Sequence, residues 1–135
     1  MSNSRKKAEA TRAVLVDLYP QCFMPKGAAK LPLKINIHHD LIAAMPEADK
    51  ESIHLVLGDY TRGNKYLECL TRDAPRINLL GNPCGKVDRN IARRADATLR
   101  ERRYVDSLKN TIAKLETENR RLWARLEFHE QGQAA

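Results

Sequence analysis

The stretch that decides the fold consists of three blocks: Leu31-Pro-Leu-Lys-Ile-Asn-Ile-His-His-Asp-Leu41, Asp59-Tyr-Thr-Arg-Gly-Asn-Lys-Tyr-Leu67 and Arg76-Ile-Asn-Leu-Leu-Gly-Asn-Pro-Cys-Gly-Lys-Val87. Each block joins an apolar anchor to a cation, an aromatic ring or a tight turn. Such a combination predicts a surface that holds a polyanion.

Length and composition around these blocks predict one modest core with an extension. The chain has 135 residues, 42% of them hydrophobic and 30% charged. Its net charge of +7 favours anionic partners, nucleic acid before an acidic protein or a membrane surface. Three cysteines without a CxxC pair indicate neither a disulfide framework nor a zinc module. With no long apolar run and no signal peptide, we expect a cytoplasmic protein without a membrane partner.

Apolar residues at helical spacing predict four helices before the third block. Pro20 and Pro46 would end the first two, and Asp49 is a candidate N-cap for the third. We expect helices over residues 5–18, 38–45, 50–60 and 64–70.

The third block predicts a small β-hairpin, and the residues after it predict one long helix. Residues 76–80 alternate, and the turn residues beyond them favour reversal of the chain. From Asp88 to Gly132 nothing breaks a helix. The predicted fold class is therefore mostly α with a small β-hairpin (α+β). We expect a domain over residues 1–99, a helical extension and candidate coiled coil over 100–130, and a disordered tail over 131–135.

The first half of the long helix is strongly basic. Seven cations and three acids lie between Lys86 and Arg103. Arg89 and Arg93 are candidate phosphate contacts, and a solvated charged helix face is the alternative.

The second half carries apolar residues at alternating spacings of three and four, the a/d pattern of a coiled coil. The candidate oligomerisation residues are Val105, Leu108, Ile112, Leu115, Asn119, Leu122 and Leu126. An Asn at an a position can pair with its symmetry mate and fix register, so Asn119 favours a parallel homodimer. The alternative is a helix that packs on its own domain or stays solvated.

A basic helix before heptads also describes a bZIP DNA-binding protein. That class has an Arg eight residues after its basic-region Asn, whereas Asn90 is followed at that spacing by Thr98. A bZIP protein also has no need of the preceding domain, so this class is disfavoured.

The first block alternates in a way that predicts a brief extended segment. Leu33, Ile35 and Ile37 would be buried, which leaves Lys34 exposed to an anion. The adjacent His38 and His39 diverge on a helix and are poorly placed to chelate one ion, so no metal or other cofactor is expected.

The second block predicts an anion site at a helix N-terminus formed by Thr61, Arg62 and Gly63. Lys65 and Tyr66 would lie one turn further on, where the Tyr66 ring can stack on a base. The alternative is that Tyr66 only packs with Tyr60. From the third block, Arg76 is expected to approach Lys34 and Tyr66.

The run from Leu18 to about Leu99 resembles the RNA-binding domain of the ProQ/FinO family of bacterial RNA chaperones. Pro-Leu-Lys-Ile-x-Ile, Tyr-Thr-x-x-x-x-Tyr-Leu and Arg-x-x-Leu-x-Gly-Asn-Pro-x-Gly carry the resemblance. It implies binding of terminator-like hairpins with a 3′ single-stranded U-rich end, in small RNAs and mRNA 3′ ends, and a role in post-transcriptional regulation.

The resemblance also implies which residues bind RNA. They are Lys34, Tyr66 and Arg76, with Lys65 beside them and residues 61–63 as a cradle for the 3′ end. The chain departs from the family at His54 and Gly58, where outward arginines are common, and at Asn36, where Gly is common. Arginines after Asp88 would compensate for the missing charge.

No catalytic set is evident, so a non-enzymatic protein is expected. The sequence has no Gly-rich phosphate loop, no metal-ligand spacing and no clustered carboxylates. The alternative function is a coiled-coil adaptor whose basic domain binds an acidic protein partner.

Overall fold

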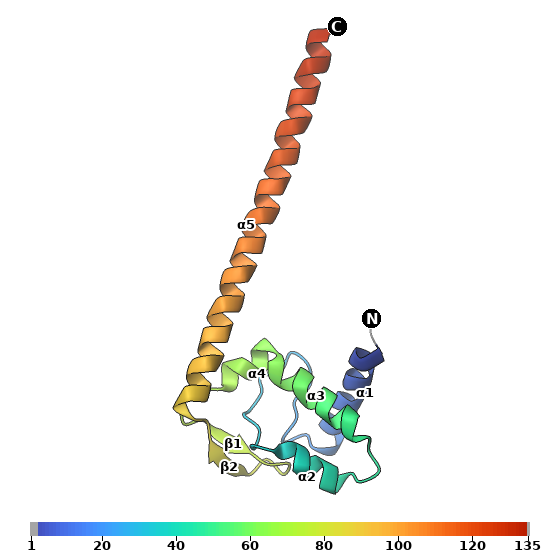
Figure 1. Ribbon diagram of the computed structural model, residues 1–135, viewed down its shortest axis with the longest axis vertical. Helices are drawn as coiled ribbons and strands as arrows, with labels where there is room; N and C mark the ends of the chain where they lie inside the picture. The colour runs from blue at the N-terminus through green and yellow to red at the C-terminus, as the bar shows by residue number, and fades with distance from the viewer. Residues whose placement is uncertain (1–2, 135) are drawn as a thin grey trace. The chain divides into compact units, whose positions relative to one another are not determined.

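A computed structural model describes residues 3–134 and confirms the predicted fold class. It contains five helices and one two-stranded antiparallel sheet within those residues (Figure 1). The elements are α1 (Asn3–Leu18), α2 (Ile37–Ala44), α3 (Lys50–Arg62), α4 (Asn64–Cys69), β1 (Pro75–Ile77), β2 (Pro83–Lys86) and α5 (Arg89–Ala134).

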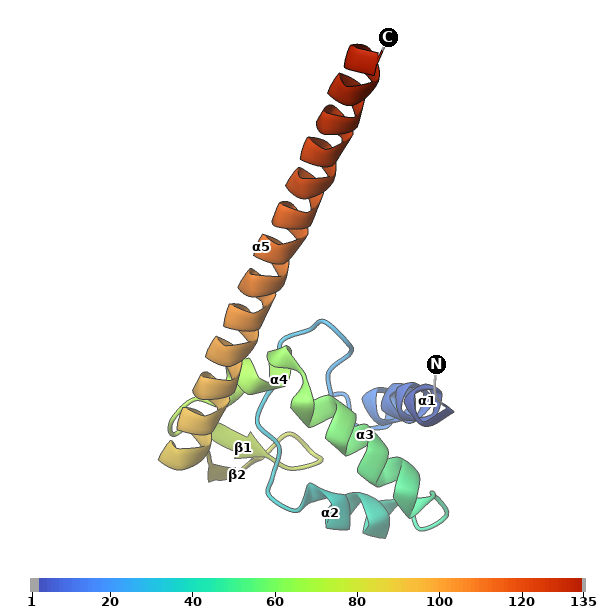
Figure 2. The same cartoon turned by 45° about the horizontal axis from the view of Figure 1, so that its top comes forward.

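The core surrounds α3, which packs against α1, α2 and α4. Figures 1 and 2 both show α3 between α1 and α2. Buried apolar side chains from these helices, from the segment between α1 and α2 and from β1 meet in one cluster, consistent with a single hydrophobic core. Its buried members are Leu15, Cys22, Phe23, Leu33, Ile37, Leu41, Ile53, Val56, Tyr60, Tyr66 and Ile77.

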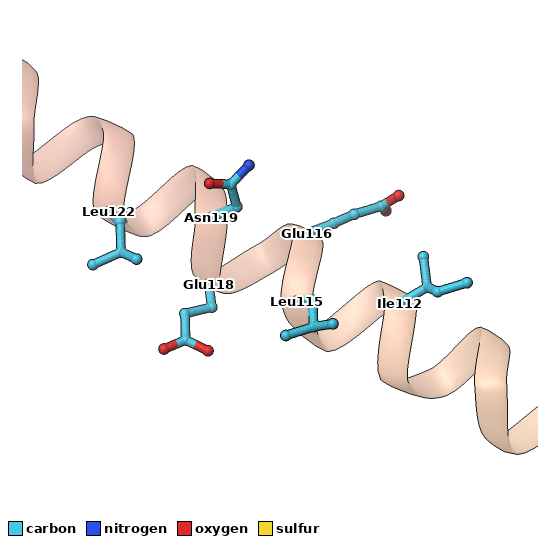
Figure 3. Close-up of a pocket in the computed structure, with 6 residues that line it drawn as sticks. All are labelled: Ile112, Leu115, Glu116, Glu118, Asn119 and Leu122. Atoms are coloured by element: carbon cyan, nitrogen blue, oxygen red, sulfur yellow. The ribbon is translucent and has the colours of Figure 1, made fainter.

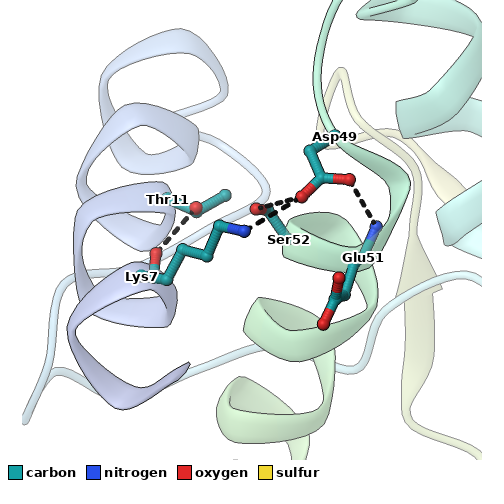
Figure 4. Close-up of polar contacts among 5 residues, drawn as sticks. All are labelled: Lys7, Thr11, Asp49, Glu51 and Ser52. Atoms are coloured by element: carbon teal, nitrogen blue, oxygen red, sulfur yellow. Dashed lines mark hydrogen bonds and ion pairs between the residues drawn. The ribbon is translucent and has the colours of Figure 1, made fainter. Parts of the chain in front are cut away.

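Asp49 is the N-cap of α3, as predicted, and it also connects α3 to α1 (Figure 4). Its carboxylate accepts hydrogen bonds from the Glu51 amide at 3.2 Å and from the Ser52 hydroxyl at 3.2 Å. Lys7 Nζ on α1 donates to it at 3.1 Å. One carboxylate thus satisfies a helix end and links two helices.

The junction of α3 and α4 differs from the prediction. Thr61 and Arg62 belong to the last turn of α3, where Thr61 Oγ1 donates to the Leu57 carbonyl at 2.8 Å and Arg62 Nε to the Gly58 carbonyl at 2.9 Å. Only Gly63, the N-cap of α4, lies at a helix start. The prediction placed the break too early, because Gly63, with φ of −71° and ψ of 155°, is the first residue to leave the helical conformation.

The segment before α2 is extended only as far as Lys34. Leu33 forms a parallel bridge with Ile77, so this segment lies beside β1. Asn36 then adopts φ of 62°, a left-handed conformation that Gly and Asn accept most readily. The turn leaves Ile35 61% exposed, so the prediction that it is buried was wrong. The same conformation explains why Asn36 can stand at a position where the family resemblance implies Gly.

The burial of apolar residues along helix α5 ends at Leu99. Ala95 and Leu99 are buried, whereas the apolar side chains from Val105 onward are exposed. Contacts divide the chain at this point, into a unit that ends at Leu99 and a unit that begins at Arg100. The helix continues to Ala134 where we expected a disordered tail, because a single Gly disfavours a helix by only about 1 kcal/mol and does not terminate it.

The three cysteines, Cys22, Cys69 and Cys84, are free. Burial raises the pKa of Cys22 to about 12 and that of Cys69 to about 11. Among the described residues, no helix is both long and apolar enough to cross a membrane, and no His, Cys, Asp and Glu side chains group together to hold a metal ion.

Candidate nucleic-acid interface

Six of the nine predicted binding residues line two hollows on the domain that ends at Leu99. The first, which we name the central groove, has a volume of about 320 Å³. It brings together Lys34, Thr61, Tyr66 and Arg76. Its full lining is Leu33, Lys34, Asn36, Ile37, His38, His54, Leu57, Gly58, Thr61, Tyr66 and Arg76.

The backbone of Leu33 holds Arg76 and Tyr66 in this groove. Arg76 Nη1 donates to the Leu33 carbonyl at 2.7 Å, and the Leu33 amide donates to the Tyr66 hydroxyl at 3.0 Å. Arg76 is only 7% exposed, and its Nε has no hydrogen-bond partner within the described chain. A buried guanidinium with an unused donor is a fixed positive charge suited to an anion.

Tyr66 is packed in the core and does not offer an open ring for stacking. It is 5% exposed, and its ring meets the Tyr60 ring edge-on at 5.9 Å between centroids. The alternative of packing with Tyr60 is therefore the one observed. Burial raises the pKa of Tyr66 despite the opposing effect of the Leu33 amide, so the hydroxyl stays neutral at the groove wall.

Lys34 lines the groove and already forms an ion pair with Asp40. Its Nζ donates to Asp40 at 2.9 Å, and each side chain of the pair is about one third exposed. The hydrogen bond and charge of Asp40 raise the pKa of Lys34. An incoming phosphate would therefore have to compete with Asp40 for this cation.

A cluster of imidazoles borders the groove, and sequence reasoning missed its position. The His38 ring lies 4.0 Å from that of His39 and 5.3 Å from that of His54. Desolvation first, and then the two neighbouring histidines, lower the pKa of His38. The neutral ring is thereby favoured at neutral pH. The sequence signal was the His-His pair together with His54 on the adjoining helix.

Arg62 covers the space that Gly58 leaves open. A Cβ at Gly58 would lie 3.3 Å from Arg62 Nη2, and Arg62 Nε donates to the Gly58 carbonyl. The guanidinium is exposed there. A cation from one turn later thus stands over position 58, where the family resemblance implies an arginine and this chain has none.

The second hollow, which we name the α1 pocket, has a volume of about 380 Å³ and contains Gly63 and Lys65. It lies apart from Lys34 and Arg76, so the structure does not join all the predicted residues in one site. Its lining residues are Arg5, Glu9, Arg12, Lys26, Gly27, Lys30, Asp59, Gly63, Asn64 and Lys65. Arg89 and Arg93 line neither hollow and are exposed on the first turns of α5.

Comparison with known proteins identifies relatives of this domain. The model of the family described as ProQ/FINO matches residues 5–111. An RNA chaperone ProQ from Shewanella amazonensis is 38% identical over 104 residues, covering 73% of this chain and 47% of its own length. The ProQ of Aliivibrio fischeri is 36% identical over 106 residues, covering 75% of this chain and 50% of its own length. The chain thus spans about half the length of these curated relatives.

Two solved structures share the fold. A ProQ homologue from Legionella pneumophila, determined by NMR, superposes with a TM-score of 0.60 at 30% identity, covering 70% of this chain and 82% of its own. The crystal structure of a FinO-like RNA chaperone from Neisseria meningitidis gives a TM-score of 0.56 at 28% identity, covering 70% of this chain and 75% of its own.

Proposed function

Because this chain belongs to the ProQ/FinO family, we propose that it is an RNA chaperone that binds hairpins at a 3′ single-stranded U-rich end. The family is non-enzymatic. One observation carries the proposal: Lys34, Tyr66 and Arg76, which are far apart in sequence, line the same groove. A groove of about 320 Å³ that contains the cations Lys34 and Arg76 suits the end of one strand better than the side of a duplex.

In the proposed complex, Arg76 supplies a fixed charge and Lys34 an exchangeable one. The guanidinium of Arg76 is held by the Leu33 carbonyl, so it is already oriented before a phosphate arrives. Lys34 would transfer its hydrogen bond from Asp40 to the phosphate. The neutral hydroxyl of Tyr66 would contact the sugar of the last nucleotide, in place of the stacking that the sequence predicted.

Exposed cations outside the groove would contact the hairpin stem. Arg62 stands over Gly58 beside the groove, and Arg89 and Arg93 are exposed on α5. Contacts of this kind supply affinity that depends on salt and not on sequence. Thr61, in the last turn of α3, and Gly63, the N-cap of α4, form the junction between the two helices.

Binding to matched nucleic acids tests this function. We expect tight binding to a hairpin with a free 3′ hydroxyl, and weaker binding to the same hairpin with a 3′ phosphate or a blunt end, or to duplex DNA. Equal affinity for all four would reject recognition of the 3′ end. Lys34→Gln should weaken the hairpin complex by about 1 kcal/mol or more, since a charged hydrogen bond is removed. Lys50→Gln, an exposed lysine that lines neither hollow, is the matched control.

We also propose that the chain forms a parallel homodimer through residues 105–126. The apolar heptad residues from Val105 to Leu126 are exposed along α5, with exposed fractions between 39% and 59%. Figure 3 shows Ile112 and Asn119 along one edge of the helix, with Leu115 and Leu122 along the other. Two rows of this kind form the seam of a two-stranded coil.

Sedimentation distinguishes the dimer from the adaptor alternative. Leu115→Glu combined with Leu122→Glu should convert a dimer into a monomer without changing hairpin binding per chain. A wild-type chain that is monomeric at micromolar concentration would reject the homodimer. An exposed heptad seam without self-association would then favour an adaptor that pairs with a different protein.

A further inference from the structure

The α1 pocket concentrates positive charge around a buried lysine. Five of its lining side chains are cationic and two, Glu9 and Asp59, are acidic. Lys30 is only 7% exposed although it carries an ammonium group at the end of a flexible chain. Lysines normally extend such a group into water, so a buried one needs a physical reason.

Lys30 has no anionic partner of its own. Among residues 3–134, its Nζ forms neither a hydrogen bond nor an ion pair, and it contacts the Tyr60 ring, 5.0 Å from the centroid. The Arg12 guanidinium lies 5.0 Å from the centroid of the same ring. Two cations therefore share one aromatic side chain.

Arg12 is also incompletely satisfied. It approaches Asp59 only to 3.8 Å, and its buried Nε has no hydrogen-bond partner within the described chain. Desolvation, followed by the charge of Arg12, lowers the pKa of Lys30. Two like charges are partly removed from water here, and among the described side chains the Asp59 carboxylate pairs with Arg12 alone. An anion would offset the remaining excess of positive charge.

The chain segment that lines the central groove also lines this pocket. Thr61 and Tyr66 face the groove, whereas Gly63, Asn64 and Lys65 between them face the α1 pocket. The contacting rings of Tyr66 and Tyr60 lie between the groove and the two cations. A single strand that crosses the α3–α4 junction therefore passes both hollows.

We propose that the α1 pocket binds a phosphate group through Lys30 and Arg12, with Lys65 at its edge, and that this phosphate belongs to the RNA held in the central groove. The inference rests on the proposed RNA function. It adds a second contact on the α1 side of the junction, in which Lys30 and Arg12 lie outside the three sequence blocks. The sequence motifs therefore did not predict these two side chains as binding residues.

The test compares Lys30→Met and Lys30→Arg with wild type in the full chain. Binding to a hairpin with a free 3′ hydroxyl is measured over a series of salt concentrations, and unfolding is followed by temperature. Lys30→Met should bind about fivefold more weakly, and its slope of log K against log salt should be smaller by about 0.7, the value for one phosphate of a single strand. Lys30→Arg should restore both. Lys109→Met, on exposed helix surface, controls for net charge.

The melting temperature separates a binding role from a structural one. Removal of a charge that is partly desolvated and repelled by Arg12 should leave the melting temperature of Lys30→Met unchanged or raise it. If that variant instead melts lower while its affinity and salt slope match those of Lys109→Met, Lys30 is structural and the inference is wrong.

Inorganic phosphate separates this inference from the proposed function. It should raise the melting temperature of wild type but not of Lys30→Met, even if the wild-type chain binds no hairpin at all; that result would keep the phosphate site and reject the RNA function. A response to inorganic phosphate with unchanged hairpin affinity in Lys30→Met would assign the pocket to a separate phosphorylated ligand and overturn its RNA role. No response to either ligand overturns the site.

Discussion

The unit that ends at Leu99 and the unit that begins at Arg100 contain similar apolar residues, which form a buried core in the first unit and are exposed in the second. Phe23 in the first is 1% exposed, whereas Phe128 in the second is 73% exposed. In the domain, apolar residues are buried among elements of the same chain, and the result is a core. In the second unit, the large apolar residues from Val105 to Phe128 are exposed. Apolar content alone therefore does not identify a core, because a core also requires neighbours.

The sharpest way to test this contrast is to truncate the same residue type in both units. Phe23→Ala should destabilise the domain by about 3–5 kcal/mol, since it removes a fully buried ring and leaves a cavity. Phe128→Ala should change stability by less than about 0.5 kcal/mol. Urea denaturation followed by circular dichroism measures both. Similar losses would mean that Phe128 is covered in solution.

A second comparison asks whether the exposed seam is buried between chains. Leu115→Ala should weaken self-association by about 2 kcal/mol or more, close to a thirtyfold change in Kd, because both copies lose a side chain from the seam. Leu80→Ala removes an equally exposed leucine from the domain and should leave self-association unchanged. Analytical ultracentrifugation over a concentration series gives both values. Equal behaviour of the two variants would place the seam outside the interface.

A third comparison uses two tyrosines. Tyr66→Phe should cost about 1–3 kcal/mol of stability, because the buried Leu33 amide loses its acceptor. Tyr104→Phe, where the side chain is 66% exposed, should have almost no effect. Thermal unfolding and amide hydrogen exchange at Leu33 report the difference. Unchanged protection of that amide would show that another acceptor replaces the hydroxyl.

The smallest expected effect concerns pH and the contact between α1 and α3. The Lys7 hydrogen bond, followed by the Glu51 amide, lowers the pKa of Asp49 in the folded chain. Stability from this carboxylate is therefore present above the unfolded pKa, near 4, and is lost as pH falls through the lower folded value. Asp49→Asn keeps an acceptor at the cap and should flatten the decline of melting temperature between about pH 5 and pH 2. An identical decline in both proteins would assign it to other carboxylates.

Much of the fold could be predicted because its signals are local. Prolines after the first two helices, the Asp49 cap and the turn residues after Leu80 each act on the adjacent backbone. The helix ends were less accurate, as at Thr61 and Arg62, because neither residue is itself a strong stop signal and the helix continues until Gly63. The burial of Ile35 was mispredicted because one left-handed residue, Asn36, interrupts the alternation.

The candidate site could be predicted only in outline. Motif order was enough to predict that Lys34, Tyr66 and Arg76 approach one another, and all three line the central groove. Their roles depended on tertiary packing: Arg76 is buried against the Leu33 carbonyl, and Tyr66 contacts Tyr60. Lys30 and Arg12 were not singled out, because a buried basic pair has no sequence signature apart from the fold that buries it.

The raised pKa values of two thiols determine how the domain responds to oxidants. Peroxides and disulfides react with thiolates, and at neutral pH Cys22, with a pKa of about 12, is almost wholly in the unreactive form. Cys69, with a pKa of about 11, is nearly as inert. Oxidation of Cys22, which is fully buried, therefore requires the domain to open first. The rate of Cys22 alkylation in native protein, compared with the rate in urea, measures how often the domain opens.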